Sequence, residues 1–227
     1  MSAYSIFDIT GPVMVGPSSS HTAGAVKIGQ IARALFNKTP KKVTFYLHGS
    51  FATVYKGHST DKALLGGIMK FTTKDPRIKE AFRIAKQKKI KYSFKEIDLG
   101  IHYHPNSVKI VLEAGKHKMS VIGSSIGGGN ITINKIDEFE VNIKGVAGKY
   151  FTLIISHKNI PGILATITSE IAKTKINIAN IQNTRLSAGG KALTIIALDG
   201  KMTLKQVQQL QDSDPNIDFV RALTKLN

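Results

Sequence analysis

The most informative absence in this chain of 227 residues is cysteine, which does not occur at all. Without thiols the chain cannot form disulfides, use a cysteine nucleophile, or ligate zinc or an iron–sulfur cluster through sulfur. No basic stretch followed by an apolar segment marks a secretory signal, and no apolar run approaches the ~20 residues that span a bilayer. We therefore predict a cytoplasmic protein that does not interact with a membrane.

Acidic residues are also few, 15 against 32 lysines and arginines, so the formal net charge is +17. A surplus of this size suits an acidic partner, a nucleic acid or an anionic substrate. However, aromatic residues make up only 7% of the chain and leave few rings to stack on bases. The lysines occur in short clusters that are typical of a solvated surface. We favour that interpretation and predict no nucleic-acid partner, while an acidic partner subunit would use part of the charge.

Hydrophobic residues make up 42% of the chain, which is enough for real cores, and the length suits one large or two modest domains. The first part alternates segments of helical period with strands. Ser20 or Thr22 is the expected N-cap of the first helix, and Ser59 or Thr60 that of the second. The expected helices span 23–37, 60–68 and 75–88, and the expected strands 42–47, 92–97, 107–114, from 119 onward, 131–136 and 140–144.

The stretch 145–149 predicts a domain boundary. After it, strands and helices follow the order β-α-β-β-α-β, which is the ferredoxin-like order. A Gly-Gly pair at 189–190 predicts the turn of the central hairpin. The predicted fold class is therefore α+β, of the α/β sandwich type, with domains at 1–145 and 149–227. In the second domain the expected strands span 150–156, 177–186, 191–198 and 217–222, and the expected helices 160–173 and 203–211.

Four polar segments of the first domain point to a binding site. The run Gly-Pro-Ser-Ser-Ser-His-Thr at 16–22 places hydroxyls and an imidazole before a helix, where free N–H groups favour an anion. A Gly-His-Ser-Thr-Asp run at 57–61, a His-Pro-Asn run at 104–106 and a Gly-rich turn at 127–130 follow. One histidine in a loop is more often structural, and serines before a helix are often only caps. Three such histidines, His21, His58 and His104, favour convergence on one pocket.

The second domain resembles an ACT domain over about residues 149–227, through the run His-Lys-Asn-Ile-Pro-Gly-Ile-Leu at 157–164 and Lys-Ile-Asn-Ile at 175–178. ACT domains bind small effectors, often amino acids at a side-by-side dimer interface. His157, Asn159 and Asn177 resemble the polar triad with which serine-inhibited phosphoglycerate dehydrogenase binds its effector. The resemblance thus implies a serine-like effector and self-association. The local alternative is that Asn159 caps a helix and Asn177 fixes a strand entry.

The whole chain resembles the beta subunits of bacterial iron–sulfur-dependent L-serine dehydratases. The four polar segments carry this resemblance, together with Gly-Ser-Ser-Ile at 123–126. Ser59 departs from the family, which more often has glycine there, and we expect little consequence. The resemblance implies an alpha subunit whose cysteines hold a [4Fe–4S] cluster. The cluster would activate the hydroxyl of L-serine as a leaving group, giving pyruvate and ammonia after loss of the α-proton. The isolated chain is expected to be inactive and colourless.

The family resemblance also implies a role for each residue of this chain that matches a family motif. Ser18, Ser19, Ser20 and Thr22 would bind the substrate carboxylate, and His58 and His104 would handle protons. Asn106 would orient the substrate or His104, and His21 completes the catalytic set. Asp61 would bind substrate or fix a histidine tautomer, or lie on the helix surface. No metal ligand is expected on this chain. Two alternatives stay open: a non-catalytic amino-acid sensor, and a basic nucleic-acid-binding protein.

Overall fold

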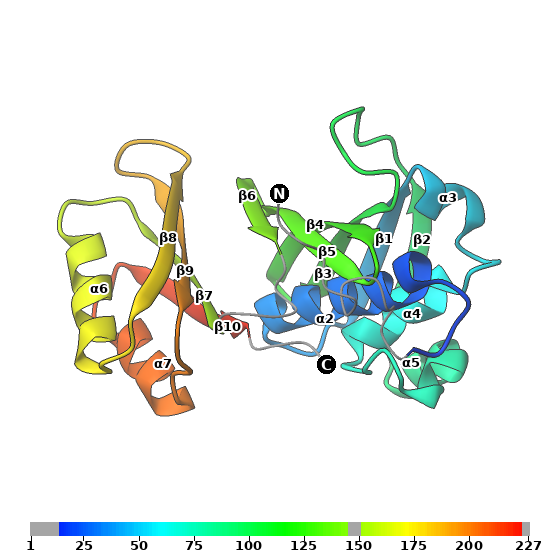
Figure 1. The fold of residues 1–227 in the computed structure, drawn as a ribbon, viewed down its shortest axis with the longest axis horizontal. Helices are drawn as coiled ribbons and strands as arrows, with labels where there is room; N and C mark the ends of the chain where they lie inside the picture. Colours follow the sequence, from blue (N-terminus) through cyan, green and yellow to red (C-terminus); the bar gives the residue numbers. More distant parts are fainter. Residues whose placement is uncertain (1–13, 145–150, 224–227) are drawn as a thin grey trace, which may run out of the picture. The chain divides into compact units, whose positions relative to one another are not determined.

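The computed structural model describes residues 14–144 and 151–223, so the predicted boundary at 145–149 lies outside the described residues. The chain divides into two compact units, one built mainly from the first range and one mainly from the second. Both mix helices with sheets (Figure 1). The predicted α+β class is confirmed. In the part of the chain described here, no helix is long and apolar enough to cross a membrane.

The first unit is a six-stranded sheet in the order β2-β1-β3-β4-β5-β6. β1 and β2 are parallel, whereas β1–β3, β3–β4 and β4–β5 are antiparallel pairs. The strands are β1 Lys42–His48, β2 Lys91–Glu96, β3 Ser107–Ala114, β4 His117–Gly127, β5 Asn130–Ile136 and β6 Phe139–Lys144.

Helices cover one face of this sheet (Figure 1). Alternate residues of β1, Val43, Phe45 and Leu47, are fully buried against that layer. A π-helical turn, η1 Ser19–Gly24, leads into the central helix, which packs on β3, β4 and β5. The elements of the layer are α2 Ala25–Phe36, α3 Ser50–Val54, α4 Thr60–Ile68, the 3-10 helix η2 Pro76–Glu80 and α5 Ala81–Gln87.

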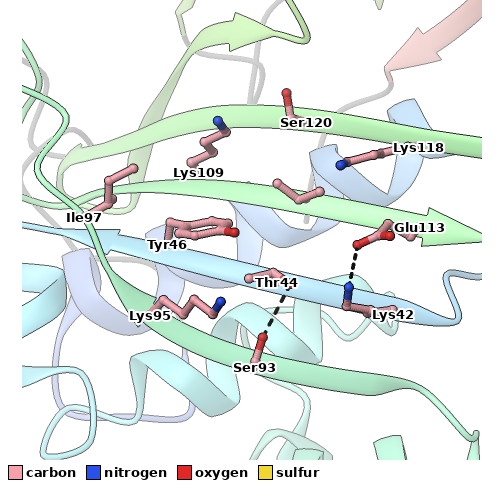
Figure 2. A pocket seen from close by; sticks show the side chains of 11 residues that line it. Lys42, Thr44, Tyr46, Ser93, Lys95, Ile97, Lys109, Glu113, Lys118 and Ser120 are labelled. Carbon is pink, nitrogen blue, oxygen red and sulfur yellow. Dashed lines mark hydrogen bonds and ion pairs between the residues drawn. The ribbon is translucent and has the colours of Figure 1, made fainter.

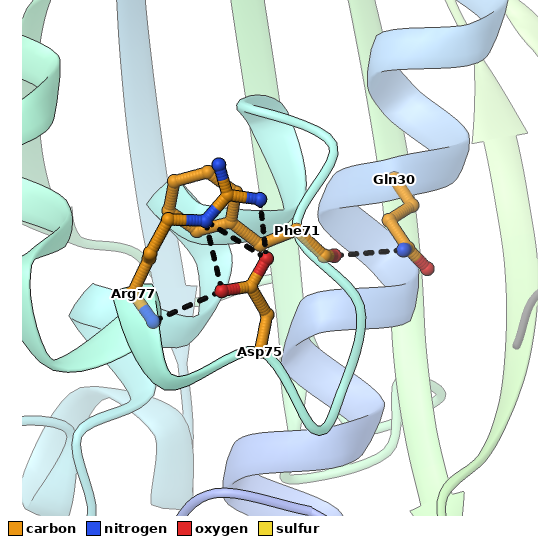
Figure 3. A network of polar contacts seen from close by, with 4 residues as sticks. All are labelled: Gln30, Phe71, Asp75 and Arg77. Carbon is orange, nitrogen blue, oxygen red and sulfur yellow. Dashed lines mark hydrogen bonds and ion pairs between the residues drawn. The ribbon is translucent and has the colours of Figure 1, made fainter.

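The segment after α4 is fixed to α2 by a small polar network (Figure 3). Gln30 donates from Nε2 to the Phe71 carbonyl at 2.8 Å, and the Arg77 guanidinium lies 4.5 Å from the Phe71 ring centroid. Asp75 caps η2 by accepting from the Arg77 N–H at 2.9 Å. Hydrogen bonds from Arg77 also hold the pKa of Asp75 below its ordinary value. The helix predicted over 75–88 is therefore present as two consecutive elements, η2 and α5, and Asp75 is the N-cap of the first.

The second unit is a four-stranded sheet in the order β10-β7-β9-β8, so β8 is an edge strand. Its core joins Leu153, Ile155 and Ile196 on the strands to Ile167 and Leu210 on the helices. The element order is the predicted β-α-β-β-α-β. The elements are β7 Phe151–Lys158, α6 Ile163–Lys173, β8 Ile178–Arg185, β9 Lys191–Leu198, α7 Leu204–Asp212 and β10 Ile217–Leu223.

Candidate active site

The polar site begins at the π-helical turn before α2. Ser18, rather than the predicted Ser20 or Thr22, is the N-cap, because its Oγ accepts from the His21 N–H at 3.2 Å. Ser19 and Ser20 are half-buried in the same turn. Thr22 is fully buried, and its hydroxyl donates to the His58 carbonyl at 3.3 Å. Thr22 therefore ties two polar segments together, and the prediction that its hydroxyl binds substrate is corrected.

His21 and His58 form the centre of the cluster. Their ring centroids lie 4.9 Å apart, and the edge of Phe51 packs against His21 at 5.4 Å. His21 Nε2 lies 3.1 Å from Ser50 Oγ, and Nδ1 lies 3.4 Å from Ser18 Oγ. Burial and the neighbouring His58 imidazole lower the pKa of His21, against a smaller opposing effect of the Ser50 hydrogen bond. His21 is therefore mainly neutral at pH 7.

His58 itself has an unusual environment. Its Nδ1 is buried and has no hydrogen-bond partner among the described residues. A buried polar atom without a partner costs free energy, so such atoms in native proteins call for an explanation. A bound ligand or an approaching partner group would supply the missing hydrogen bond. The predicted convergence of His21 and His58 is therefore present in the geometry.

The segment with His104 reaches this cluster through backbone contacts. Gly49 has φ 56°, and a Cβ there would lie 2.7 Å from the Pro105 carbonyl oxygen, so only glycine fits between the segments. Phe51 N–H donates to the same oxygen at 3.3 Å. His104 is exposed, and its Nδ1 accepts from the Asn106 N–H at 3.1 Å. In the neutral ring the proton is therefore on Nε2, the nitrogen left to face a ligand.

The β4–β5 hairpin closes the opposite side. Ser125 N–H donates to the Asn106 carbonyl at 2.9 Å, and Ser125 Oγ is fully buried without a partner among the described residues. A Cβ on Gly24 would lie only 2.0 Å from that Oγ, so the end of η1 and β4 touch at this point. Below it a chain of buried hydrogen bonds links Ser107, Ser124 and Asn134 at 2.7 and 2.8 Å.

Lys27 joins α2 to the tip of the same hairpin. Its Nζ donates to the Gly129 carbonyl at 2.8 Å, and its side chain is buried. Burial lowers the pKa of this ammonium. Sequence reasoning missed Lys27, although a single lysine in a helix that is apolar nearly all round was a visible signal. It also missed Ser125, which lies in the Gly-Ser-Ser-Ile run at 123–126, and Ser50, which is the first residue of the short helix α3.

Two residues of the 57–61 run differ from expectation. Asp61 is buried in the first turn of α4, where burial raises the pKa of its carboxyl, and Oδ1 accepts from the Lys62 N–H at 2.7 Å. It makes no hydrogen bond to a histidine in the described structure and does not lie on the helix surface.

Ser59 occupies the N-cap position with φ 57°, yet its hydroxyl makes no capping bond. Ser59 is therefore the N-cap residue, as predicted, but the capping hydrogen bond expected from its hydroxyl is absent.

The three predicted effector residues do not meet within one chain. His157 is fully buried and bonded to Thr194 Oγ1 at 2.7 Å, and Asn159 lies beside Ser187 and Gly190. Asn177 instead bonds Asp199 Oδ2 at 2.8 Å, at the other end of β9. Eight strand residues at about 3.3 Å each separate these ends by roughly 25 Å. A single site formed by all three within one chain is therefore excluded.

Among the described residues, no group of three or more acidic or histidine side chains is arranged to hold a metal ion. The fold and site thus define an α+β protein in which a helix-covered sheet carries a cluster of histidines and hydroxyls at the start of α2. Residues 5–135, which span that cluster, match the family model described as serine dehydratase beta chain. The chain belongs to this family, which confirms the resemblance seen in the sequence.

Curated relatives agree with this assignment. The chain is 42% identical over 195 residues to a probable L-serine dehydratase beta chain of Bacillus subtilis, covering 86% of this chain and 87% of the relative. It is 41% identical over 208 residues to the L-serine dehydratase beta chain of Peptoniphilus asaccharolyticus, covering 89% and 90%. Among solved structures, the ACT domain of a Chlorobium tepidum GTP pyrophosphokinase matches 32% of this chain and 95% of its own length, with TM-score 0.28 and 20% identity.

Proposed function

We propose that this chain is the beta subunit of an L-serine dehydratase and supplies groups that bind L-serine and move its protons. One observation carries the proposal: the family match at 5–135 contains all the polar segments that meet around His21. The overall reaction removes the α-proton and the hydroxyl of L-serine as water. The aminoacrylate that results tautomerises and hydrolyses to pyruvate and ammonia.

The first turn of η1, which leads into α2, is suited to the substrate carboxylate. The first N–H groups of a helix have no intrahelical acceptor, and the helix dipole is positive at this end. The hydroxyls of Ser18, Ser19 and Ser20 lie in the same turn. Together they offer neutral donors to an anion without placing a carboxylate nearby.

Proton transfer falls to the His21–His58 pair. His21 has a lowered pKa and is neutral at pH 7, so it can accept a proton. A positive charge on the neighbouring His58 ring, whose centroid lies 4.9 Å away, lowers the pKa of His21 further. Ser50 and Ser18 orient the His21 ring. His104, whose Nε2–H has no other partner in the neutral ring, is placed to donate a hydrogen bond to the substrate.

An iron–sulfur cluster does not fit on this chain. Cysteine is absent, and the described residues contain no metal-binding group. We therefore assign the [4Fe–4S] cluster to a partner alpha subunit, along with activation of the leaving hydroxyl. The unpartnered Nδ1 of His58 and Oγ of Ser125 are groups that substrate or this partner would satisfy.

The test is reconstitution of this chain with an alpha subunit under anaerobic conditions and measurement of pyruvate from L-serine. We expect no turnover by either chain alone. His58→Asn and His21→Asn should each lower kcat by about 10²-fold or more, as expected for loss of an acid–base group. His117→Asn is the matched control, because His117 lies at the far end of β4 against Phe36. Wild-type turnover in both site variants would overturn the proposal, as would turnover by the isolated chain.

We further propose that the second unit binds an amino-acid effector between two copies of the chain. The edge strand β8 leaves backbone groups unpaired, and Ile181 on it is 44% exposed. Antiparallel pairing of β8 with a second copy would bring Asn177 of one chain to the end that holds Asn159 of the other. L-Serine should then shift sedimentation toward a dimer, and Asn159→Ala should abolish the shift. Tight serine binding to a chain that stays monomeric would contradict this arrangement.

A further inference from the structure

The face of the first sheet that carries no helices is hollowed (Figure 2). The hollow has a volume of about 440 Å³ and extends across β1, β2, β3 and β4. Its residues alternate with the core residues of the same strands: Thr44 and Tyr46 face the hollow, whereas Val43, Phe45 and Leu47 face the helices. It shares no residue with the cluster around His21, which lies at the helix-covered side.

The floor of the hollow is well covered. Thr44 is 6% exposed and Val111 is 9% exposed, although no helix lies over them. Ser93 Oγ donates to Thr44 Oγ1 at 3.4 Å and closes the floor between β1 and β2.

The walls carry an excess of positive charge. Lys42, Lys95, Lys109 and Lys118 line the hollow, with Glu113 as its single carboxylate, so the sum is four minus one, or +3. Lys42 pairs with Glu113 at 3.0 Å, and Lys95 lies 5.9 Å from the Tyr46 ring centroid. Among the described residues, Lys109 and Lys118 have no carboxylate partner.

We propose that this hollow binds a small molecule that bears several negative charges, of the phosphate-ester or pyrophosphate class. The volume falls within the range of small-molecule sites. Lysine ammonium groups make charge-assisted hydrogen bonds to phosphate oxygens, and the hydroxyls of Tyr46 and Ser120 are further donors that line the hollow. L-Serine and pyruvate each carry one carboxylate, so a +3 hollow discriminates against them in favour of multiply charged anions. The site is thus separate from the proposed reaction.

The experiment titrates the full chain with inorganic pyrophosphate at low ionic strength, followed by calorimetry and by amide NMR shifts. The test variant is Lys109→Met with Lys118→Met, which keeps the apolar stems. The matched control is Lys86→Met with Lys88→Met, which removes the same charge from α5 on the helix-covered side. We expect the control to bind like wild type and the test variant to bind at least tenfold more weakly, with shifts confined to β1–β4.

Three results would overturn the proposal. One is absence of binding by wild type at millimolar pyrophosphate. Another is equal weakening in both double variants, which would show that only the overall charge attracts the anion. The third is binding of an acidic peptide, such as oligoglutamate, at this face in preference to pyrophosphate, which would identify a protein-docking surface. Thermal unfolding of each variant checks that the fold is intact, and serine turnover of the reconstituted complex tests the proposed function separately.

Discussion

At the scale of single residues, Ser59 shows how a departure from a family pattern acquires a physical meaning. Its φ of 57° is in the left-handed region, where a side chain with Cβ is strained and glycine is not. The sequence suggested that its hydroxyl would compensate by capping α4, but no capping bond forms. The serine therefore has a conformational cost without the compensating contact.

We predict that Ser59→Gly stabilises the chain by about 1 kcal/mol, because it removes the left-handed strain. Urea unfolding followed by circular dichroism measures the change. Ser59→Ala keeps the strain and serves as the control, with no gain expected. A loss of stability in the glycine variant would show that the hydroxyl contributes more than its contacts suggest.

The histidine pair predicts a pH dependence of stability. Because the pKa of His21 is lowered in the folded chain, its contribution to stability is complete above its ordinary value of 6.5 and is lost as pH falls through the folded pKa. Thermal unfolding between pH 8 and pH 5 should therefore show a decline that is smaller in His21→Asn. His102→Asn, in an exposed loop, should decline like wild type. Parallel curves for all three proteins would refute this origin.

At the scale of elements, periodicity predicted most of the structure. The strand Ser107–Ala114 and the helix Thr60–Ile68 were predicted to the residue, because apolar spacing and turn residues agree there. Helix α3 was missed, since five residues are too few to show a period. The π-helical turn was missed as well. Several consecutive serines can each serve as N-cap, so the sequence does not show at which of them the helix begins.

The contact between η1 and β4 gives a prediction at this scale. Because a Cβ at Gly24 would lie 2.0 Å from Ser125 Oγ, Gly24→Ala forces the helix and the strand apart. We expect a loss of about 1–3 kcal/mol in unfolding free energy, as in overpacked cores. In the double variant with Ser125→Gly, part of that loss should be recovered, which a double-mutant cycle measures. If the losses of the two single variants simply added in the double variant, the strain would not arise from the contact between residues 24 and 125.

At the scale of the whole molecule, the βαββαβ order could be predicted from the sequence, whereas the way its polar residues come together could not. His157, Asn159 and Asn177 follow one another in a motif, and sequence order cannot tell whether such residues meet within a chain or between chains. The β8–β9 hairpin places them at opposite ends of a strand. Similarly, Lys27 and Gly129 are 102 positions apart, so their contact required the sheet order to be known.

We predict that a fragment of residues 149–227 folds without the rest of the chain, because its strands and helices enclose a common apolar core. Its chemical denaturation should be a single cooperative transition, and its far-ultraviolet dichroism should show both helix and strand. A fragment that lacks a cooperative transition would mean that the core needs the remaining residues to close. A fragment that carries Ile167→Ala is the control and should unfold about 2–5 kcal/mol more easily.

The hydrogen bond from Lys27 to Gly129 also has a consequence during synthesis of the chain. His21 leaves the ribosome early, but the hairpin that completes its surroundings follows about a hundred residues later, or roughly 5–20 s at usual elongation rates. A chain released before β5 therefore lacks one wall of the site and the sheet that supports it. Only a finished first unit can therefore present the assembled histidines.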